Sequence, residues 1–453
     1  MRKISLLALA CTCTTVLAAG CGTTASTSPT PASTTSAAPA ASASAPAATT
    51  AAAKPVTLKY LTWDYADRTK STDAWIKDMK EKYNITIEMQ NVPTDQYESS
   101  FKTKLAANDL PDLVAVHGVD KGLVAEKAHI DAKQFLDLSD LKSVSEYLPA
   151  VIKDRKDNKA NKLFYVPVST NVLGVTYNKK LFKDNGLTVP TNIDDFVAAV
   201  EKLKAANVTP IAGSFKDAWT TQIVNFIAFG QYVNSKDMNT RVKLADGSLK
   251  YGDIKQDVSK ALNVQLDWLS KGYFTKDYLG TDVNVASAMV GTGKTAMLIN
   301  GTWQYKSVQD ADPKAEIGFF ALPLNAKGEK TAVPTSADSG IMINADSKNV
   351  EAAKIALNAY LSADNQTRVI ADLNGISTNT KVKSDNAYIA EVVGAMSSGD
   401  VQPDWWGGNS NYQPSGSTFV YDKEMQNLVA KGKTVDQFIS DFDKANDKAL
   451  EKK

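Results

Sequence analysis

The fold is decided by residues 56–116, which begin with Val56-Thr57-Leu58-Lys59-Tyr60-Leu61-Thr62-Trp63. This opening stretch alternates in polarity and is rich in β-branched and aromatic residues, so it predicts a strand. An amphipathic helix is expected next over 73–83, with Asp73 as its cap. The pattern continues with a strand over 85–89, a helix over 96–107 and a strand over 112–116. Strands that alternate with helices in this way predict a parallel arrangement in an α/β sheet.

The same alternation resumes after residue 170. Strands are expected over 174–177, 210–212, 295–299 and 317–320, and helices over 193–206, 256–270, 284–290, 350–362 and 435–451. Either Thr191 or Asn192 is expected to cap the helix that starts at residue 193. A chain of 453 residues is too long for one core, because single cores stop growing near about 250–300 residues. The sequence therefore predicts two α/β lobes.

The first twenty residues have the pattern of a secretory signal peptide. Arg2 and Lys3 give a basic start, and a short apolar run follows that is too short to span a bilayer. The run ends in Leu17-Ala18-Ala19-Gly20-Cys21, which resembles the bacterial lipobox, in which the cysteine is acylated. The alternative is an ordinary cleavage site at which Cys21 is incidental. We expect residues 1–20 to be removed and Cys21 to carry lipid.

Residues 21–54 are expected to form a lipidated tether. All positions from Gly22 to Ala53 are Gly, Ala, Ser, Thr or Pro, a composition that cannot bury enough apolar surface to fold. Of the three cysteines, Cys11 and Cys13 lie within the signal, so the mature chain keeps Cys21 alone. No disulfide or cysteine metal cluster is therefore expected. We predict an extracellular protein held at the cell membrane through its lipid.

The balance of charge excludes two classes of partner. The chain has 51 basic and 50 acidic residues, and loss of Arg2 and Lys3 leaves 49 against 50. A nucleic-acid binder would concentrate Lys and Arg to neutralise phosphates, so no nucleic-acid partner is expected. A net charge of −1 also gives no attraction to anionic membrane lipids. The lipid attached to Cys21 is therefore expected to be the only membrane contact.

Several short motifs, in order along the chain, resemble the extracellular solute-binding proteins that include the maltose-binding protein and serve ABC sugar importers. Two motifs depart from the family pattern: Ile193 replaces an aromatic residue, and Ile376 and Ser377 interrupt the late turn. The stretches that carry the resemblance are Leu110–Val114, Pro167–Asn171, Tyr177–Phe182, Thr191–Phe196, Gly293–Met297, Asn300–Trp303 and Asn374–Ser377.

This resemblance implies a two-lobed periplasmic-binding-protein-like fold of type II. Each lobe would be a mixed sheet flanked by helices, with a ligand cleft at the hinge that closes on binding. We expect one lobe to comprise residues 55–170 plus 335–378, and the other 171–334 plus 379–453. The hinge would lie near Asn171, Pro334 and Asn379. The implied function is capture of a carbohydrate, an oligosaccharide, by a monomer that delivers it to ABC permease subunits without cofactor or covalent chemistry.

Candidate sugar contacts follow the expected strands. Aromatic faces stack on the C–H patches of a pyranose, while amides and carboxylates bond its hydroxyls. Trp75 and Trp268 lie on apolar helix faces and are expected in the core instead. The candidates from strand ends and family positions are Trp63, Asp64, His117, Asp120, Lys121, Asn171, Asp217, Trp219 and Trp303. Trp405 and Trp406 complete the set. At least one of these two adjacent indoles is expected to face the sugar, and the sequence does not indicate which one.

Other functions fit the sequence less well. Gly293-Lys294-Thr295 ends like a P-loop, but Ala288 stands where its first glycine belongs, and a helix rather than a strand is expected before it. His117 and His129 are the only histidines, and neither has metal-ligand spacing. A glycan-degrading lipoprotein would need a convergent carboxylate pair, which no pattern singles out. A receptor for a peptide or polyamine would favour an acidic or ion-pairing cleft over stacked indoles.

Overall fold

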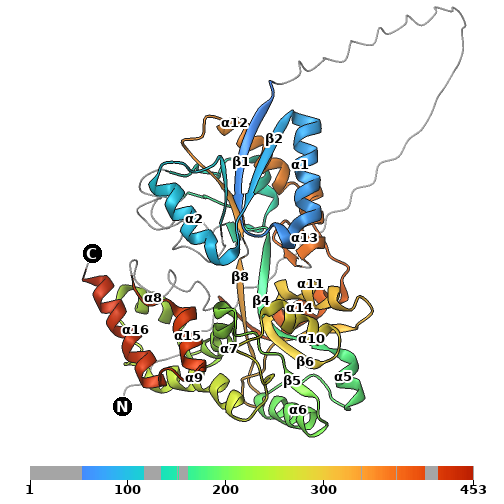
Figure 1. Ribbon diagram of the computed structural model, residues 1–453, viewed down its shortest axis with the longest axis vertical. Helices are drawn as coiled ribbons and strands as arrows, with labels where there is room; N and C mark the ends of the chain where they lie inside the picture. Colours follow the sequence, from blue (N-terminus) through green and yellow to red (C-terminus); the bar gives the residue numbers. More distant parts are fainter. Residues whose placement is uncertain are drawn as a thin grey trace, which may run out of the picture. The chain divides into compact units, whose positions relative to one another are not determined.

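A computed structural model describes residues 54–116, 134–149, 151–152, 162–337, 339–373, 375–403 and 417–451. It contains two sheets, both flanked by helices (Figure 1). The predicted α/β class with two mixed sheets is therefore confirmed. None of the helices in these ranges is both long and apolar enough to span a bilayer.

The first sheet has four strands in the order β2-β1-β3-β9. Strand β1 pairs in parallel with β2 and β3, as the alternating pattern predicts, and β9 runs antiparallel to β3. These strands are β1 (Val56–Thr62), β2 (Ile85–Asn91), β3 (Leu113–Val116) and β9 (Gly340–Ile343). The helices that belong with them are α1 (Thr69–Tyr83), α2 (Thr94–Ala106), α12 (Val350–Leu361) and α13 (Ala363–Leu373).

The prediction of a cap at Asp73 is wrong. Helix α1 begins at Thr69, four residues earlier than expected, so Asp73 lies within it. The Asp73 side chain instead accepts a hydrogen bond from the Tyr65 hydroxyl at 2.9 Å. The short 3-10 helix η1 (Tyr65–Arg68) runs directly into α1, which explains the early start.

The second sheet has seven strands, with β11-β8-β4-β6-β5 as its main path and β7 and β10 paired to β4. Strand β4 runs antiparallel to its neighbours, while β5 is parallel to β6 and β11 to β8, so the sheet is mixed. The strands are β4 (Ser169–Asn178), β5 (Thr209–Ile211), β6 (Thr295–Gly301), β7 (Ile317–Phe320), β8 (Ala332–Ala337), β10 (Ile376–Ser377) and β11 (Asp400–Pro403).

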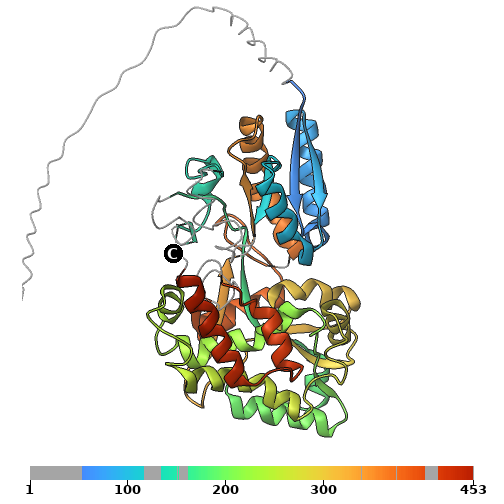
Figure 2. The ribbon, with the colours of Figure 1, turned by 60° about the vertical axis from the view of Figure 1, so that its left-hand side comes forward.

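Helices surround this second sheet, and Figure 2 shows the red helices α15 and α16 beside it. The Asn192 side chain caps α6 by accepting from the amide of Asp195 at 3.1 Å, which confirms one of the two expected caps. The helices are α5 (Lys179–Asp184), α6 (Ile193–Ala205), α7 (Ile223–Phe229), α8 (Thr240–Asp246), α9 (Lys255–Ser270), α10 (Val283–Gly291), α11 (Tyr305–Ala311), α14 (Ala387–Ser398), α15 (Tyr421–Val429) and α16 (Val435–Leu450).

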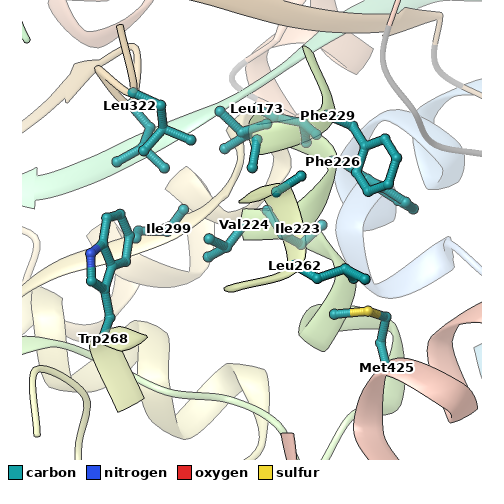
Figure 3. Packing of buried hydrophobic residues seen from close by; sticks show 14 of the residues in the cluster. Leu173, Ile223, Val224, Phe226, Phe229, Leu262, Trp268, Ile299, Leu322 and Met425 are labelled. Carbon is teal, nitrogen blue, oxygen red and sulfur yellow. The ribbon is translucent and has the colours of Figure 1, made fainter. Parts of the chain in front are cut away.

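Each sheet has its own apolar core. Trp75 is 1% exposed in the core of the first sheet and Trp268 is 4% exposed in that of the second, so both predicted core tryptophans are confirmed. In Figure 3, Trp268 lies in one cluster with Ile299 and Leu262. Burial of each such side chain contributes about 1.5–3 kcal/mol to folding. Each sheet, together with its helices, therefore has its own source of stability.

The chain passes between the sheets at three points within the described residues: before β4, between β8 and β9, and between α13 and α14, a stretch that includes the two-residue strand β10. Hydrogen bonds join these crossing segments. The amide of Val168 donates to the Ser339 carbonyl oxygen at 3.4 Å, and the amide of Thr378 donates to the Val168 carbonyl oxygen at 3.2 Å. All three connections therefore meet through backbone contacts.

Candidate functional site

Two of the predicted sugar contacts, Trp219 and Trp303, lie side by side. Strands β5 and β6 are parallel neighbours, so their carboxyl ends meet at one edge of the second sheet. Trp219 lies in the short helix η3 (Ala218–Gln222) after β5, and Trp303 in η5 (Thr302–Gln304) directly after β6. The two ring centroids are 6.3 Å apart with the planes tilted by 51°. Both residues are half-buried, and both pack against the core of the second sheet.

The position of the Trp303 indole depends on a glycine. A Cβ at Gly301 would lie 2.0 Å from Cζ3 of Trp303, closer than any real contact. The φ angle of Gly301 is −87°, a value that any residue adopts. Space, and not backbone conformation, therefore requires glycine here, because the indole lies directly against the bare backbone at the end of β6.

Asp217 precedes Trp219 and is half-buried. One of its carboxylate oxygens, Oδ2, accepts a hydrogen bond from the amide of Val283 at 2.8 Å, at the start of α10. Asp282 caps the same helix, and the pKa of its carboxyl is lowered chiefly by the hydrogen bond from the amide of Val285. Asp217 therefore connects the loop that carries Trp219 to α10.

Asn171 lies in β4, opposite Ser336 of β8 in the antiparallel pairing. Its side chain is half-buried. Both strands adjoin crossing segments, so this amide lies where the chain passes between the sheets. Its predicted contact with sugar stays a prediction.

Trp63 and Asp64 follow β1 in the first sheet. The Trp63 ring packs edge-on against Tyr97 of α2, with centroids 4.6 Å apart, and Trp63 is half-buried. Asp64 is 9% exposed, and its carboxylate has internal partners. The hydroxyl of Thr62 donates to Asp64 Oδ1 at 2.5 Å, and Arg68 Nε lies 3.1 Å from Asp64 Oδ2.

Arg68 and Ser339, which were not among the predicted site residues, complete this cluster. Arg68 is 4% exposed, and its Nη1 donates to the Tyr360 hydroxyl at 3.0 Å while Nη2 donates to the Ser339 hydroxyl. The Ser339 hydroxyl in turn donates to Asp64 Oδ2 at 3.4 Å. The spacing of four between Asp64 and Arg68 is a signal for an ion pair, but nothing local indicates Ser339.

The remaining predicted residues lie outside the described ranges: His117, Asp120, Lys121, Trp405, Trp406 and Cys21. Within the described ranges, no three His, Cys, Asp or Glu side chains gather as a metal site. The sequence around Lys294 forms a turn from helix α10 to strand β6, with Gly293 at a φ of +72°. A helix thus precedes this turn, as predicted, and the P-loop order of strand before glycines is not met.

Comparisons with known proteins agree with this architecture. The family model "Bacterial extracellular solute-binding protein" matches residues 63–367. The chain is similar to the multiple sugar-binding protein of Streptococcus mutans, with 27% identity over 303 residues that cover 65% of this chain and 69% of that protein. It is also similar to the melibiose/raffinose/stachyose-binding protein MelE of Bacillus subtilis, with 26% identity over 56% of this chain and 68% of that one.

Solved structures share the fold. The solute-binding protein RafE in complex with raffinose superposes with a TM-score of 0.73 at 22% identity, covering 87% of this chain and 99% of RafE. A chitin oligosaccharide binding protein gives a TM-score of 0.75 at 21% identity, covering 88% and 99%. At these identities the likeness concerns the fold alone. The family model spans well over half of the sequence, and on that evidence this chain belongs to the bacterial extracellular solute-binding proteins, a family of non-enzymatic receptors.

Proposed function

We propose that this protein captures an oligosaccharide outside the cell and delivers it to the permease subunits of an ABC transporter. The names of its relatives support this, since they bind multiple sugars or melibiose, raffinose and stachyose. Structures that share its fold hold raffinose and stachyose. No nucleic acid, cofactor or second copy of the chain takes part in this proposal.

The observation that carries the proposal is the indole pair of Trp219 and Trp303. Two partly exposed indoles whose planes are tilted by 51° could contact two sides of a sugar or two adjacent rings. Asp217, beside the pair, adds a carboxylate for hydroxyl groups, and one of its oxygens already bonds Val283. The remaining predicted contacts, among them Trp63 and Asn171, are proposed to complete the site across the other sheet and the crossing segments.

The lobe boundaries belong to the same proposal. We assign residues 55–170 with 335–378 to one lobe and 171–334 with 379–453 to the other. Two observations support them: α12 and α13 contribute to the core that contains β1, whereas α15 and α16 contribute to the core that contains β6. A ligand cleft between lobes with separate cores could close through torsions in the crossing segments.

Removal of the Trp303 indole tests the proposed site. We expect Trp303→Ala to weaken the binding of raffinose or stachyose by at least about tenfold in calorimetric titration, since stacking and burial of an aromatic ring together exceed about 1.4 kcal/mol. Because Trp303 is only half-buried, the variant should stay folded at room temperature. The matched control is Trp268→Ala, which removes a core indole and should cost about 3–5 kcal/mol of stability. Unchanged sugar affinity in folded Trp303→Ala would show that the Trp303 indole is not part of the sugar site.

The lipid anchor is the second part of the proposal. Cys21 follows a lipobox-like sequence and precedes the tether, and the balanced charge offers no other membrane contact. We expect Cys21→Ala to release folded protein into the soluble fraction when cells are fractionated. Folded variant that stays with the membrane would contradict anchoring through Cys21.

A further inference from the structure

The strongest feature outside the indole pair is the buried cluster of Asp64, Arg68 and Ser339. Arg68 contributes three contacts in three directions: Nε to Asp64, Nη1 to Tyr360 and Nη2 to Ser339. The Ser339 hydroxyl accepts from Arg68 and donates to Asp64, so it closes a triangle with both charges. A buried ion pair needs such additional hydrogen bonds, because desolvation of both charges otherwise outweighs their attraction.

The members of the cluster belong to parts of the chain with different roles. Asp64 directly follows β1 and is the neighbour of Trp63, a proposed sugar contact. Ser339 lies between β8 of the second sheet and β9 of the first, on a crossing segment. Its carbonyl oxygen also accepts from the amide of Val168, which precedes β4 on another crossing segment. Ser339 thus contacts Asp64 through its side chain, and it contacts a second crossing segment through its backbone.

We infer that Arg68 is a positioning residue. It couples Trp63 and Asp64, which belong to the proposed sugar site, to the crossing segment at Ser339. The inference rests on the proposed function for its sugar-binding part. Arg68 and Ser339 hold the Asp64 carboxylate, and with it the backbone that presents Trp63. A change of torsion near Ser339 must break or remake its hydroxyl contacts with the buried pair. The arrangement of the crossing segments and the geometry of the sugar contacts therefore change together.

The test compares two hydroxyl partners of the same guanidinium. Ser339→Ala removes the partner on the crossing segment, and Tyr360→Phe removes the partner on α12, which lies within the core of the first sheet. Both variants keep the Arg68–Asp64 ion pair, so neither leaves a buried charge without its counterion. A net hydrogen bond corresponds to about a three- to tenfold change in an equilibrium constant.

Two readouts are measured on the full chain: raffinose affinity by calorimetry, and amide hydrogen exchange in peptides that contain Val168, without sugar. We expect Ser339→Ala to weaken raffinose binding about three- to tenfold and to speed exchange at Val168 by a similar factor. Tyr360→Phe should lower the melting temperature while affinity and Val168 exchange stay within about twofold of the wild type.

Val168 exchange that is unchanged in Ser339→Ala would overturn the inference, as would equal effects of the two variants on affinity and exchange. If the wild type binds neither raffinose nor stachyose, the proposed function fails in its sugar specificity. The exchange comparison still decides whether Ser339 restrains the crossing segments, because it is made without ligand.

Discussion

Gly301 and Trp303 show how one absent side chain shapes a surface. The indole of Trp303 occupies the space that a Cβ at position 301 would fill, and the backbone at Gly301 has an ordinary φ angle. Substitution at Gly301 should therefore move the ring without straining the main chain. A substitution at Gly301 therefore tests where the indole lies, whereas Trp303→Ala tests whether the indole is needed at all.

We predict that Gly301→Ala weakens oligosaccharide binding by about tenfold, comparable to loss of the ring itself, because the indole must leave its place. Calorimetric titration measures the affinity, and near-ultraviolet circular dichroism reports the changed tryptophan environment. The control is Gly394→Ala in α14, where an added Cβ meets no atom within 4 Å. That variant should gain about 0.5–1 kcal/mol from helix propensity with unchanged affinity. Equal affinity in Gly301→Ala and the wild type would show that the indole position does not matter.

The sequence predicted the positions of the tryptophans better than the buried contact between Arg68 and Ser339. Trp75 and Trp268 lie on apolar helix faces, and that local pattern was enough to place them in the core. Trp219 and Trp303 follow strands that turned out to be parallel neighbours, which brings the rings together. Arg68 and Ser339 are 271 positions apart, so no local pattern could indicate their contact.

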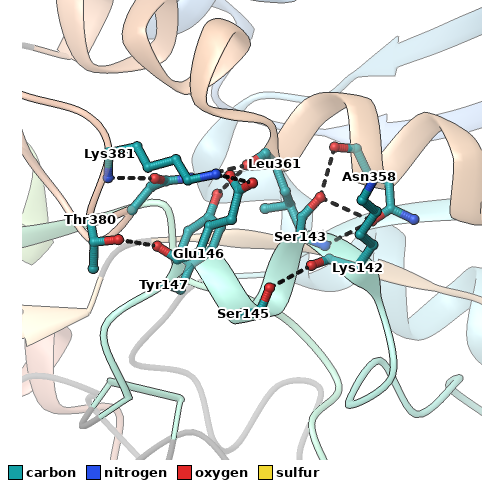
Figure 4. Close-up of polar contacts among 10 residues, drawn as sticks. Lys142, Ser143, Ser145, Glu146, Tyr147, Asn358, Leu361, Thr380 and Lys381 are labelled. Carbon is teal, nitrogen blue, oxygen red and sulfur yellow. Dashed lines mark hydrogen bonds and ion pairs between the residues drawn. The ribbon is translucent and has the colours of Figure 1, made fainter. Parts of the chain in front are cut away.

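Among the elements, the third crossing segment is fixed to the short helix η2 (Lys142–Glu146). Both the amide and the hydroxyl of Thr380 donate to the carbonyl oxygen of Glu146, at 2.8 and 2.9 Å (Figure 4). Lys381 Nζ donates to the Glu146 carboxylate at 2.7 Å. This hydrogen bond is the largest cause of the lowered pKa of Glu146.

This contact predicts a specific pH dependence. Because the pKa of Glu146 is lower in the folded than in the unfolded state, its stabilisation is complete above the unfolded pKa and is lost as pH falls through the folded one. Lys381→Met should cost at most about 1 kcal/mol at pH 7, since Lys381 is exposed to solvent, and much less near pH 3. Urea unfolding at both pH values measures the difference, with Lys381→Arg as the control that keeps the charge. A cost that is equal at both pH values would assign the effect to packing.

Two long helices with a strong apolar period were predicted closely. The helices over 193–206 and 256–270 are found as α6 and α9 within one residue at each end. Strand β4 extends well beyond the predicted 174–177, because its first residues pair with β8 and β10. Strands β10 and β11 have two and four residues and no predicted counterpart, since only distant partners make them strands.

On the scale of the whole molecule, two sheets with separate cores are joined by crossing segments that contact one another through Val168, Ser339 and Thr378. The alternation of elements predicted two α/β units, and the short motifs predicted the family. Neither could predict which segments meet at the crossings, because that depends on pairing between parts of the chain more than 150 residues apart. The proposed closure requires separate cores, because each sheet could then move while its own core stays packed.

The central claim is that these units close on an oligosaccharide. Small-angle X-ray scattering of the chain without its signal peptide, with and without stachyose at a concentration that calorimetry shows to be saturating, tests it most directly. The account predicts a smaller radius of gyration in the sugar-bound protein, because torsions in the crossing segments bring the units together. The same radius of gyration in the free and the saturated protein would contradict it.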